Sequence, residues 1–331
     1  MNPIEHAIAL LKAGKLVAIP TETVYGLGAD ARNPIAIQNI YLAKERPSSN
    51  PLIIHISDMS ALSDWAIDIP DTAFQLAKAF WPGPLTLILA RHPSVPKIVT
   101  GGQESIAIRI PNHLLTLELL ERFDGGIAAP SANRYGRISP TTTEHVRTEL
   151  GSRVDYILEG GACTLGIEST IVSLLDDIPI ILRQGSISET DLSAVLKQPV
   201  RQKQSEKGAV KLEHDLITPG SHLSHYAPTT PLYLCKKERF LETALNWARN
   251  NKRFCALSFS VPVNALLEQG VPDYCIAKWI VASENHHMYA QKLYAYLHDF
   301  DATKSDCLLI ENPPNTAAWA AIRDRLQRAA S

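Results

Sequence analysis

A polar segment at residues 196–230 divides this chain into two parts, each with its own pattern of apolar residues. The segment carries Lys and Gln early and ends in a run with Pro and Gly, which bend a chain without supplying a core. At 331 residues the chain is also longer than one hydrophobic core usually serves. We therefore predict a first domain at residues 1–198, a linker at 199–230 and a second domain at 231–331.

In the first part, helical and strand-like patterns alternate, and some neighbouring strands are joined by hairpin-like returns. This mixture favours a twisted mixed α/β sheet with helices over a purely parallel sheet. The expected helices are at residues 4–14, 34–45, 71–80, 114–123 and 142–150. The expected strands are at 16–20, 52–57, 85–90, 105–110, 126–129, 156–158, 169–174 and 180–183.

The second part repeats strand and helix more regularly, which predicts a small, doubly wound, Rossmann-like parallel sheet. Its expected strands are at residues 232–235, 254–259, 274–280 and 308–310, and its helices at 238–250, 284–298 and 315–329. The first of these strands is followed by Lys236, Lys237 and Glu238 in place of a glycine-rich dinucleotide fingerprint. No cofactor site is therefore predicted at that strand end.

Composition excludes several classes of protein. The net charge of −2 argues against a protein built mainly to coat nucleic acid or an anionic membrane. The five cysteines contain no C-x-x-C pair, so we expect buried thiols in a reducing compartment. The N-terminal pattern is not that of a signal peptide, and no apolar run approaches the length of a membrane span. We expect a cytoplasmic protein.

The run KERPSSNPLI at residues 44–53 carries the strongest chemical signal. Lys44 and Arg46 stand at the end of an expected helix, Pro47 stops it, and Asn50 follows on a turn. A compact ammonium and a planar guanidinium both match phosphate oxygens, so this run can hold a polyphosphate. The alternative is a solvated helix C-terminus, where cations suit the helix dipole. We expect both cations at the surface, where their loss alters stability by about 0.5 kcal/mol or less.

Three further segments accompany this run: IPTETVYGLG at residues 19–28, AAPSAN at 128–133 and GIESTIV at 166–172, with SIAIRIP at 105–111 between them. In this order and spacing they resemble the YrdC-like family, the threonylcarbamoyl-AMP synthases, over roughly residues 5–195. The remainder resembles the C-terminal domain of the longer members. The resemblance implies a YrdC-like catalytic domain that joins L-threonine, bicarbonate and ATP into threonylcarbamoyl-AMP, a nucleotidyltransferase reaction that releases pyrophosphate and serves tRNA modification.

The resemblance also assigns site residues. Lys44 and Arg46 are the expected catalytic residues. The expected ATP-binding residues are Lys44, Arg46, Asn50, Ser105, Ser131, Asn133, Ser139, Arg183 and Tyr226. The expected threonine-binding residues are Thr23, His55, Arg109, Ala129 and Ser169. ATP implies Mg²⁺, for which the motifs offer no carboxylate cluster beyond Glu22 and Glu168, so we expect phosphates and water to hold most of the ion.

Several of these assignments have structural alternatives. Arg109 interrupts an apolar strand, where it binds either the substrate carboxylate or a structural ion-pair partner. His55 is either a ligand contact or a satisfied core histidine, and Ser139 either a nucleotide contact or part of a helix cap. The linker ends in His225-Tyr226-Ala227-Pro228, which suggests a lid with Tyr226 on ATP. The residues before it differ from the family pattern, which leaves other linker contacts open.

Two other functions are possible from the sequence: an RNA-binding module with a basic concave sheet, or a carbamoyl-phosphate-using maturation enzyme. The net charge counts against the first. The second would need acylphosphatase and zinc-finger parts, which the sequence lacks. Expected partners are the three substrates and, transiently, downstream tRNA threonylcarbamoyl-transferase proteins. Direct tRNA binding and the oligomeric state stay open.

Overall fold

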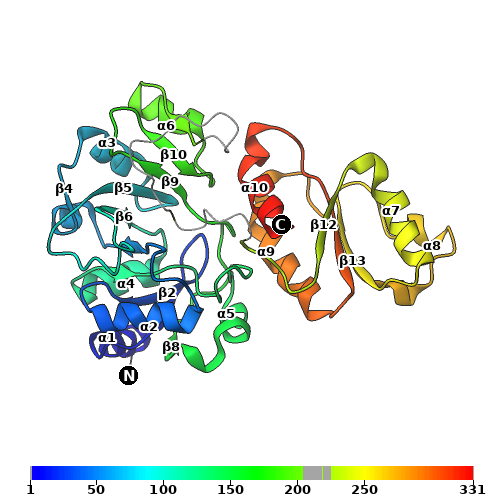
Figure 1. Cartoon of the computed structure of the whole chain (residues 1–331), viewed down its shortest axis with the longest axis horizontal. Helices are drawn as coiled ribbons and strands as arrows, with labels where there is room; N and C mark the ends of the chain where they lie inside the picture. Colours follow the sequence, from blue (N-terminus) through cyan, green and yellow to red (C-terminus); the bar gives the residue numbers. More distant parts are fainter. Residues whose placement is uncertain (1, 204–217, 219–224, 331) are drawn as a thin grey trace. The chain divides into compact units, whose positions relative to one another are not determined.

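The computed structural model describes residues 2–203, 218 and 225–330. The chain separates into two compact units (Figure 1). The N-terminal unit comprises residues 1–135 and 139–221, and the C-terminal unit comprises residues 136–138 and 222–331. Each unit is described below on its own.

The N-terminal unit is built on one 11-stranded sheet in the order β11-β10-β9-β5-β6-β3-β7-β2-β1-β8, with β4 paired to β5. The strands are β1 (Val17–Ile19), β2 (Gly26–Asp30), β3 (Ile53–His55), β4 (Ala66–Ile67), β5 (Leu85–Arg91), β6 (Ser105–Arg109), β7 (Ile127–Ala128), β8 (Tyr156–Ile157), β9 (Thr170–Ser173), β10 (Ile180–Arg183) and β11 (Arg201–Gln202). The sheet contains both parallel pairs, such as β3 with β6, and antiparallel pairs, such as β5 with β6. The predicted mixed sheet is confirmed.

Helices cover both faces of this sheet. They are α1 (Pro3–Lys12), α2 (Pro34–Lys44), α3 (Asp71–Phe80), α4 (Leu114–Phe123), α5 (Thr143–Leu150) and α6 (Glu189–Leu196), with 3₁₀ turns η1 (Met59–Asp64) and η2 (Gly151–Arg153). In β1, Val17 and Ile19 join the core beneath α1 and α4, whereas Ala18 points into the larger core that includes α2 and α3. Side chains of a strand alternate between faces, so one strand supplies both cores.

Local signals determine where α2 begins and ends, and this helix positions the cationic run. The Asn33 side chain accepts hydrogen bonds from the N–H groups of Ile35 and Ala36, and Pro34 occupies the first turn. Glu45 then adopts a left-handed conformation with φ 54°, which ends the helix directly after Lys44.

The C-terminal unit is a four-stranded, wholly parallel sheet in the order β12-β15-β13-β14. Its strands are β12 (Leu232–Cys235), β13 (Phe254–Ser258), β14 (Ile276–Val281) and β15 (Cys307–Glu311). Its helices are α7 (Lys237–Arg249), α8 (Asn264–Leu267), α9 (His286–Ala302) and α10 (Ala320–Ala329), with 3₁₀ turns η3 (Asp273–Cys275) and η4 (Ala317–Trp319). Helices α7 and α8 lie on one side of this sheet, and α9 and α10 on the other (Figure 1). The predicted doubly wound parallel sheet is confirmed.

The predicted linker at 199–230 is divided in the structure. Residues 201–202 form β11, which pairs with β10 of the N-terminal unit. Residues 225–230 belong to the C-terminal unit. Most of the segment between them, residues 204–217 and 219–224, lies outside the described residues.

A second departure from the predicted boundaries is the short segment at residues 136–138, which clusters with the C-terminal unit. Arg137 forms an isolated bridge with Ala227, and its guanidinium lies 3.3 Å from a carboxylate oxygen of Asp301. These contacts join residues 90 and 164 positions apart in sequence, which a local pattern does not reveal. Among the described residues, no helix is long and apolar enough to cross a membrane.

Candidate active site

The side chains of Lys44 and Arg46 are both buried, contrary to the surface positions expected from the sequence. Lys44 is 1% exposed, and its ammonium donates to the backbone carbonyls of Ser131 and Asn133, both at 2.5 Å. Burial, followed by the nearby charge of Arg46, lowers its pKa well below the ordinary value. Lys44 thus ties the end of α2 to the loop that carries two predicted nucleotide contacts.

Arg46 and Asn50 meet at one aromatic side chain, Tyr135. The Arg46 guanidinium lies 5.6 Å from the centre of the Tyr135 ring and donates to the Pro51 carbonyl at 3.0 Å. The Asn50 amide donates to the Tyr135 hydroxyl at 3.2 Å. A cation over an aromatic face and a hydrogen bond to the same ring restrict the orientation of both side chains.

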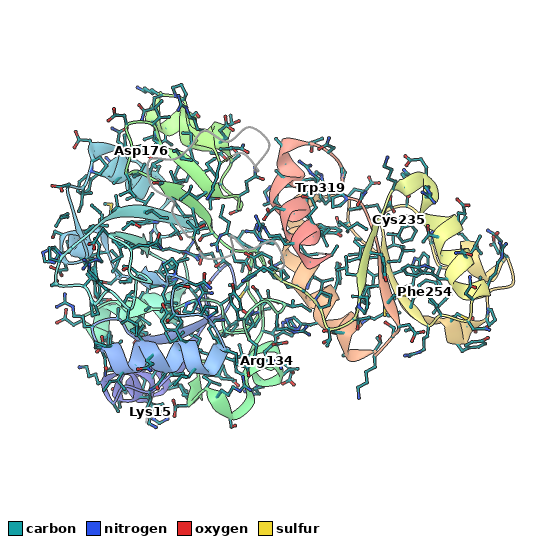
Figure 2. The ribbon with its side chains drawn as sticks, in the orientation of Figure 1. Lys15, Arg134, Asp176, Cys235, Phe254 and Trp319 are labelled. Carbon is teal, nitrogen blue, oxygen red and sulfur yellow. The ribbon has the colours of Figure 1, made fainter. Side chains whose placement is uncertain are left out.

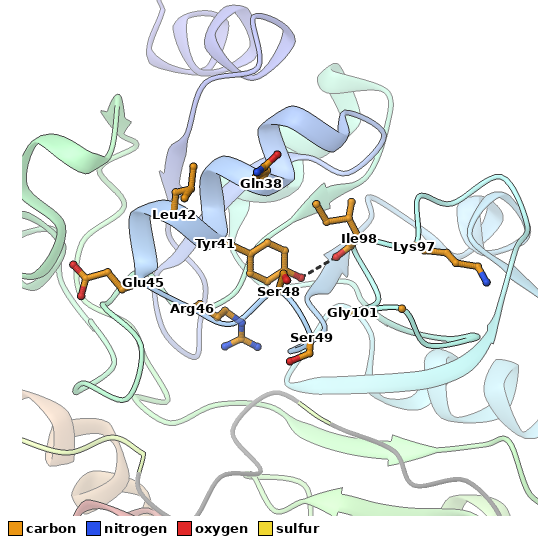
Figure 3. A pocket seen from close by; sticks show the side chains of 11 residues that line it. Gln38, Tyr41, Leu42, Glu45, Arg46, Ser48, Ser49, Lys97, Ile98 and Gly101 are labelled. Atoms are coloured by element: carbon orange, nitrogen blue, oxygen red, sulfur yellow. Dashed lines mark hydrogen bonds between the residues drawn. The ribbon is translucent and has the colours of Figure 1, made fainter.

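A hollow of about 870 Å³ opens beside Arg46, between α2 and the loop at residues 97–102. Figure 3 shows Arg46, Ser48 and Ser49 along this hollow, with Tyr41 at its back. The Tyr41 hydroxyl donates to the Ile98 carbonyl at 2.9 Å, which fastens the loop to the helix (Figure 3). Burial raises the pKa of Tyr41 to about 12, so its hydroxyl stays protonated and keeps this bond at physiological pH.

Arg109 occupies a buried polar cluster. Its guanidinium forms an ion pair with Glu22 at 2.7 Å, and both side chains are at most 5% exposed. It also donates to the Thr23 hydroxyl at 2.9 Å and to the Gly83 carbonyl at 3.1 Å. The structural partner considered for Arg109 is therefore present, and it lies beside Thr23, a predicted threonine contact.

His55 and Ala129 lie next to this cluster. His55 is the partner of Arg109 in the register of β3 and β6, and the Ala129 N–H bonds the Ile53 carbonyl of β3 at 2.9 Å. Burial, and then the charge of Arg109, lower the pKa of His55 to about 3, so its imidazole is neutral at physiological pH. Its Nδ1 is buried and has no hydrogen-bond partner in the described part of the chain.

Ser169 and Arg183, predicted for different substrates, are bonded to each other. The Arg183 guanidinium donates to the Ser169 hydroxyl at 3.0 Å and to its carbonyl at 3.1 Å. The hydroxyl also lies 2.7 Å from that of Thr86. Because Leu87 pairs with Ile108 in antiparallel register, Thr86 stands beside Arg109 in the sheet. Ser169 and Arg183 therefore extend the Arg109 cluster across β5.

The remaining predicted nucleotide contacts are more scattered. The buried Ser139 hydroxyl donates to the Glu168 carboxylate at 2.6 Å. Ser131 forms an isolated bridge with Gly26, close to the carbonyls that bind Lys44. Ser105 begins β6, four residues before Arg109, which places the two roughly 13 Å apart along the strand.

Tyr226 belongs to the C-terminal unit. Its ring is 1% exposed, stacks on Tyr294 with centres 5.9 Å apart, and lies under the Arg325 guanidinium at 5.1 Å. These contacts account for a large aromatic residue at the end of the predicted linker. The lid and the contact between Tyr226 and ATP stay predictions.

The described ranges, 2–203, 218 and 225–330, contain no group of three or more His, Cys, Asp or Glu side chains arranged to hold a metal. Glu22 is paired with Arg109, and Glu168 accepts from Ser139. These donors do not form a protein cage. They fit an ion held mainly by substrate phosphates and water.

Comparison with known proteins identifies the family. Residues 9–185 match the domain family described as "Telomere recombination", and residues 187–331 match the "Threonylcarbamoyl-AMP synthase, C-terminal domain". The chain is 41% identical over 330 residues to the threonylcarbamoyl-AMP synthase of Bacillus subtilis, covering 99% of this chain and 92% of that protein. The chain belongs to the threonylcarbamoyl-AMP synthase family.

The whole two-unit fold of this synthase family recurs in a solved relative. The crystal structure of Pyrococcus abyssi Sua5 complexed with L-threonine has a TM-score of 0.87 and 33% identity, over 99% of this chain and 94% of that chain. A threonylcarbamoyl-AMP synthase of the same organism is 34% identical over 98% of this chain and 93% of that protein. This protein is therefore a long-form member, with both a catalytic and a C-terminal domain.

The sequence predicted no role in the candidate site for Thr86 or Tyr135, and it suggested Glu22 only as a metal ligand. Each had a local signal: Glu22 is a charge inside an apolar motif, Thr86 is a lone hydroxyl in an apolar strand, and Tyr135 follows the Ser-Ala-Asn run by two residues. What the sequence lacked was the partner of each one, which lies between 83 and 89 positions away.

Proposed function

We propose that this chain synthesises threonylcarbamoyl-AMP from L-threonine, bicarbonate and ATP, with release of pyrophosphate. The observation that carries the proposal is a buried cluster in which His55 and Arg109 of the paired strands β3 and β6 lie with Thr23 and Ala129 of adjoining loops, in a chain whose full-length relatives are named for this activity. The product supplies the threonylcarbamoyl group that downstream tRNA threonylcarbamoyl-transferase proteins place on tRNA.

The paired charges of Glu22 and Arg109 suit a free amino acid. A zwitterionic amino acid carries its carboxylate and its ammonium on the same α-carbon, and the pair presents an acceptor and a donor 2.7 Å apart. Two of the five guanidinium N–H groups donate to Thr23 and Gly83. Those of Nη2, the nitrogen paired with Glu22, donate no hydrogen bond within the described residues, so they can donate to the substrate carboxylate. The side chains of Thr23 and His55 then lie within the same cluster to bond the threonine hydroxyl, which would favour threonine over analogues that lack it.

The nucleotide occupies the neighbouring region lined by Arg46 and Asn50, with Ser131, Asn133, Ser139 and Arg183 as further contacts. The threonine ammonium loses a proton to solvent, and the resulting amine combines with bicarbonate to form a carbamate and water. A carbamate oxygen then attacks the α-phosphorus, and the bond from that phosphorus to pyrophosphate breaks. Negative charge grows on phosphate oxygens during this step, so fixed guanidinium groups stabilise the transition state more than the substrate. Lys44 holds the Ser131–Asn133 loop in place and retains a third N–H donor beyond its two carbonyl bonds. When bound with ATP, Mg²⁺ supplies charge neutralisation on the leaving pyrophosphate.

The decisive experiment measures pyrophosphate release from ATP by the purified full chain, with threonine and bicarbonate supplied together and each omitted. The proposal requires release that depends on both. Release from ATP with carbamoyl phosphate in place of bicarbonate would favour the maturation-enzyme alternative. Absence of release together with RNA binding would favour the RNA-binding module.

A further inference from the structure

The C-terminal unit contains a hollow that its Rossmann-like pattern did not predict. It measures about 570 Å³ and lies between the edge strand β12 and helix α7; we call it the β12–α7 groove. Its aromatic lining residues are Tyr233 and Trp247, and its charged ones are Lys236, Arg239 and Lys252. It therefore combines flat apolar surface with positive charge inside one unit.

The groove exists because α7 does not cover the outermost strand. Tyr233 of β12 is the register partner of Leu309 in β15, so both side chains face α7. Leu309 is fully buried beneath the helix, whereas Tyr233 at the sheet edge is 49% exposed. Trp247 of α7 meets the Tyr233 ring edge to face at 5.3 Å, and its other side packs on Phe254 (labelled in Figure 2). An exposed aromatic floor at a sheet edge is thus held rigidly by the core.

The cations of the groove have no neutralising anion among the described residues. In the part of the chain that the structure describes, no carboxylate forms an ion pair with Lys236, Arg239 or Lys252. No carboxylate lines the groove either. Lys252 lies over the Trp247 ring at 5.7 Å, while Lys236 and Arg239 flank the first turn of α7, where unpaired backbone N–H groups add to the positive potential.

We propose that the β12–α7 groove binds a nucleotide unit, with its base stacked on Tyr233 and its phosphate held by Lys236 and Arg239. A base has the planar face that an exposed tyrosine accepts, and a phosphate has the acceptor geometry that Arg and Lys match. The hollow falls within the volume range of small-ligand pockets. None of the residues that line the groove is among those proposed to bind threonine or ATP in the reaction. The groove lies beside the edge strand and includes Lys236, at the strand end where a glycine fingerprint would otherwise hold a dinucleotide.

The test uses the full chain carrying Arg46→Ala, which weakens the proposed catalytic nucleotide site and leaves the groove unchanged. Equilibrium binding is measured for AMP, for a hexauridylate oligonucleotide and for inorganic phosphate. Each is titrated into this background, into Tyr233→Ala, and into the double variant Lys236→Ala/Arg239→Ala. The matched control, Lys237→Ala/Arg249→Ala, removes two exposed cations of the same helix that do not line the groove.

We expect the double variant to weaken binding by about tenfold or more and Tyr233→Ala by about fivefold or more, with the control unchanged. Saturable AMP binding identifies a free nucleotide as the ligand, and binding of the oligonucleotide alone identifies a single-stranded RNA. The proposal is overturned if neither probe binds, or if the groove variants bind like the control. It is also overturned if phosphate binds as tightly as AMP, because the aromatic floor would then contribute nothing.

Discussion

The Arg46 guanidinium lies over the ring of Tyr135, 5.6 Å from its centre, and the hydroxyl of the same ring accepts a hydrogen bond from Asn50. One aromatic residue thus contacts two side chains proposed to bind the nucleotide. Tyr135 follows Asn133 by two residues, so it belongs to the same loop that Lys44 holds in place. The orientation of Arg46 is therefore coupled to the position of that loop.

We predict that Tyr135→Ala raises the KM for ATP by about three- to tenfold, since it removes a cation–π contact and a hydrogen bond that are each worth about 0.5–1.5 kcal/mol. Tyr135→Phe keeps the ring, so it should raise the KM for ATP by no more than about threefold. Steady-state pyrophosphate release at varied ATP and saturating threonine measures both. Tyr274→Ala, at an exposed tyrosine of the other unit, is the control. Equal ATP KM values for the Ala and native proteins would exclude a positioning role.

Arg109→Gln should raise the KM for threonine far more than that for ATP, because Arg109 contacts Thr23 in the proposed amino-acid site. It should also lower the free energy of unfolding by about 3 kcal/mol, because it leaves the buried Glu22 carboxylate without its cation. Denaturant titration and substrate titrations separate the two effects.

The double variant Glu22→Gln/Arg109→Gln tests the ion pair further. It should be more stable than the sum of the single losses predicts, since neither charge is left alone in the core. Arg122→Gln, at a partly exposed arginine in contact with Glu5 and Glu118, should leave the unfolding midpoint unchanged.

In the single variant Arg109→Gln, a KM for ATP that rises while the KM for threonine stays constant would assign Arg109 to the nucleotide.

His55 predicts how stability changes with pH. Its pKa is about 3 in the fold, against about 6.5 in the unfolded chain, so the unfolded state binds more protons between these values. The stabilisation that comes from keeping His55 neutral is fully present above pH 6.5 and is lost progressively as the pH falls toward 3. As the pH falls from 7 to 5, protonation of this one residue in the unfolded state should lower the free energy of unfolding by up to about 2 kcal/mol.

Denaturant titrations at pH 7 and pH 5 test this. His55→Asn should show a smaller decrease on acidification than the native chain, and His287→Asn, at an exposed histidine, should show the same decrease as the native chain. An unchanged pH dependence in His55→Asn would mean that another group controls the acid response.

Sequence pattern predicted the elements whose signals are local. Helix α2 is an example: Asn33 and Pro34 mark its start, and the following cationic run marks its end. Helix α6 has an equally local signal, the reciprocal capping box of Ser188 and Asp191, but it is not among the helices expected from the apolar pattern.

The features that could not be predicted depend on distant pairing. Glu22 and Arg109 are 87 residues apart, and the segment at 136–138 pairs with residue 227. In such cases the sequence identifies a charged residue in an apolar setting but not its partner. The burial of Lys44 is of this kind, because it depends on the Ser131–Asn133 loop folding back over the end of α2.

That burial changes what is expected of Lys44→Ala. The sequence alone predicted a surface substitution with little effect on stability. In the structure the ammonium satisfies two backbone carbonyls, and its removal leaves both without that donor in a buried setting. We therefore predict that Lys44→Ala lowers the free energy of unfolding by about 2–3 kcal/mol and loosens the loop that carries Ser131 and Asn133. Hydrogen exchange at these loop amides should accelerate in Lys44→Ala but not in Lys12→Ala, an exposed lysine of α1. If unfolding and loop exchange both match the native chain while pyrophosphate release is abolished, Lys44 acts directly on the phosphates and its two carbonyl bonds contribute nothing to the fold.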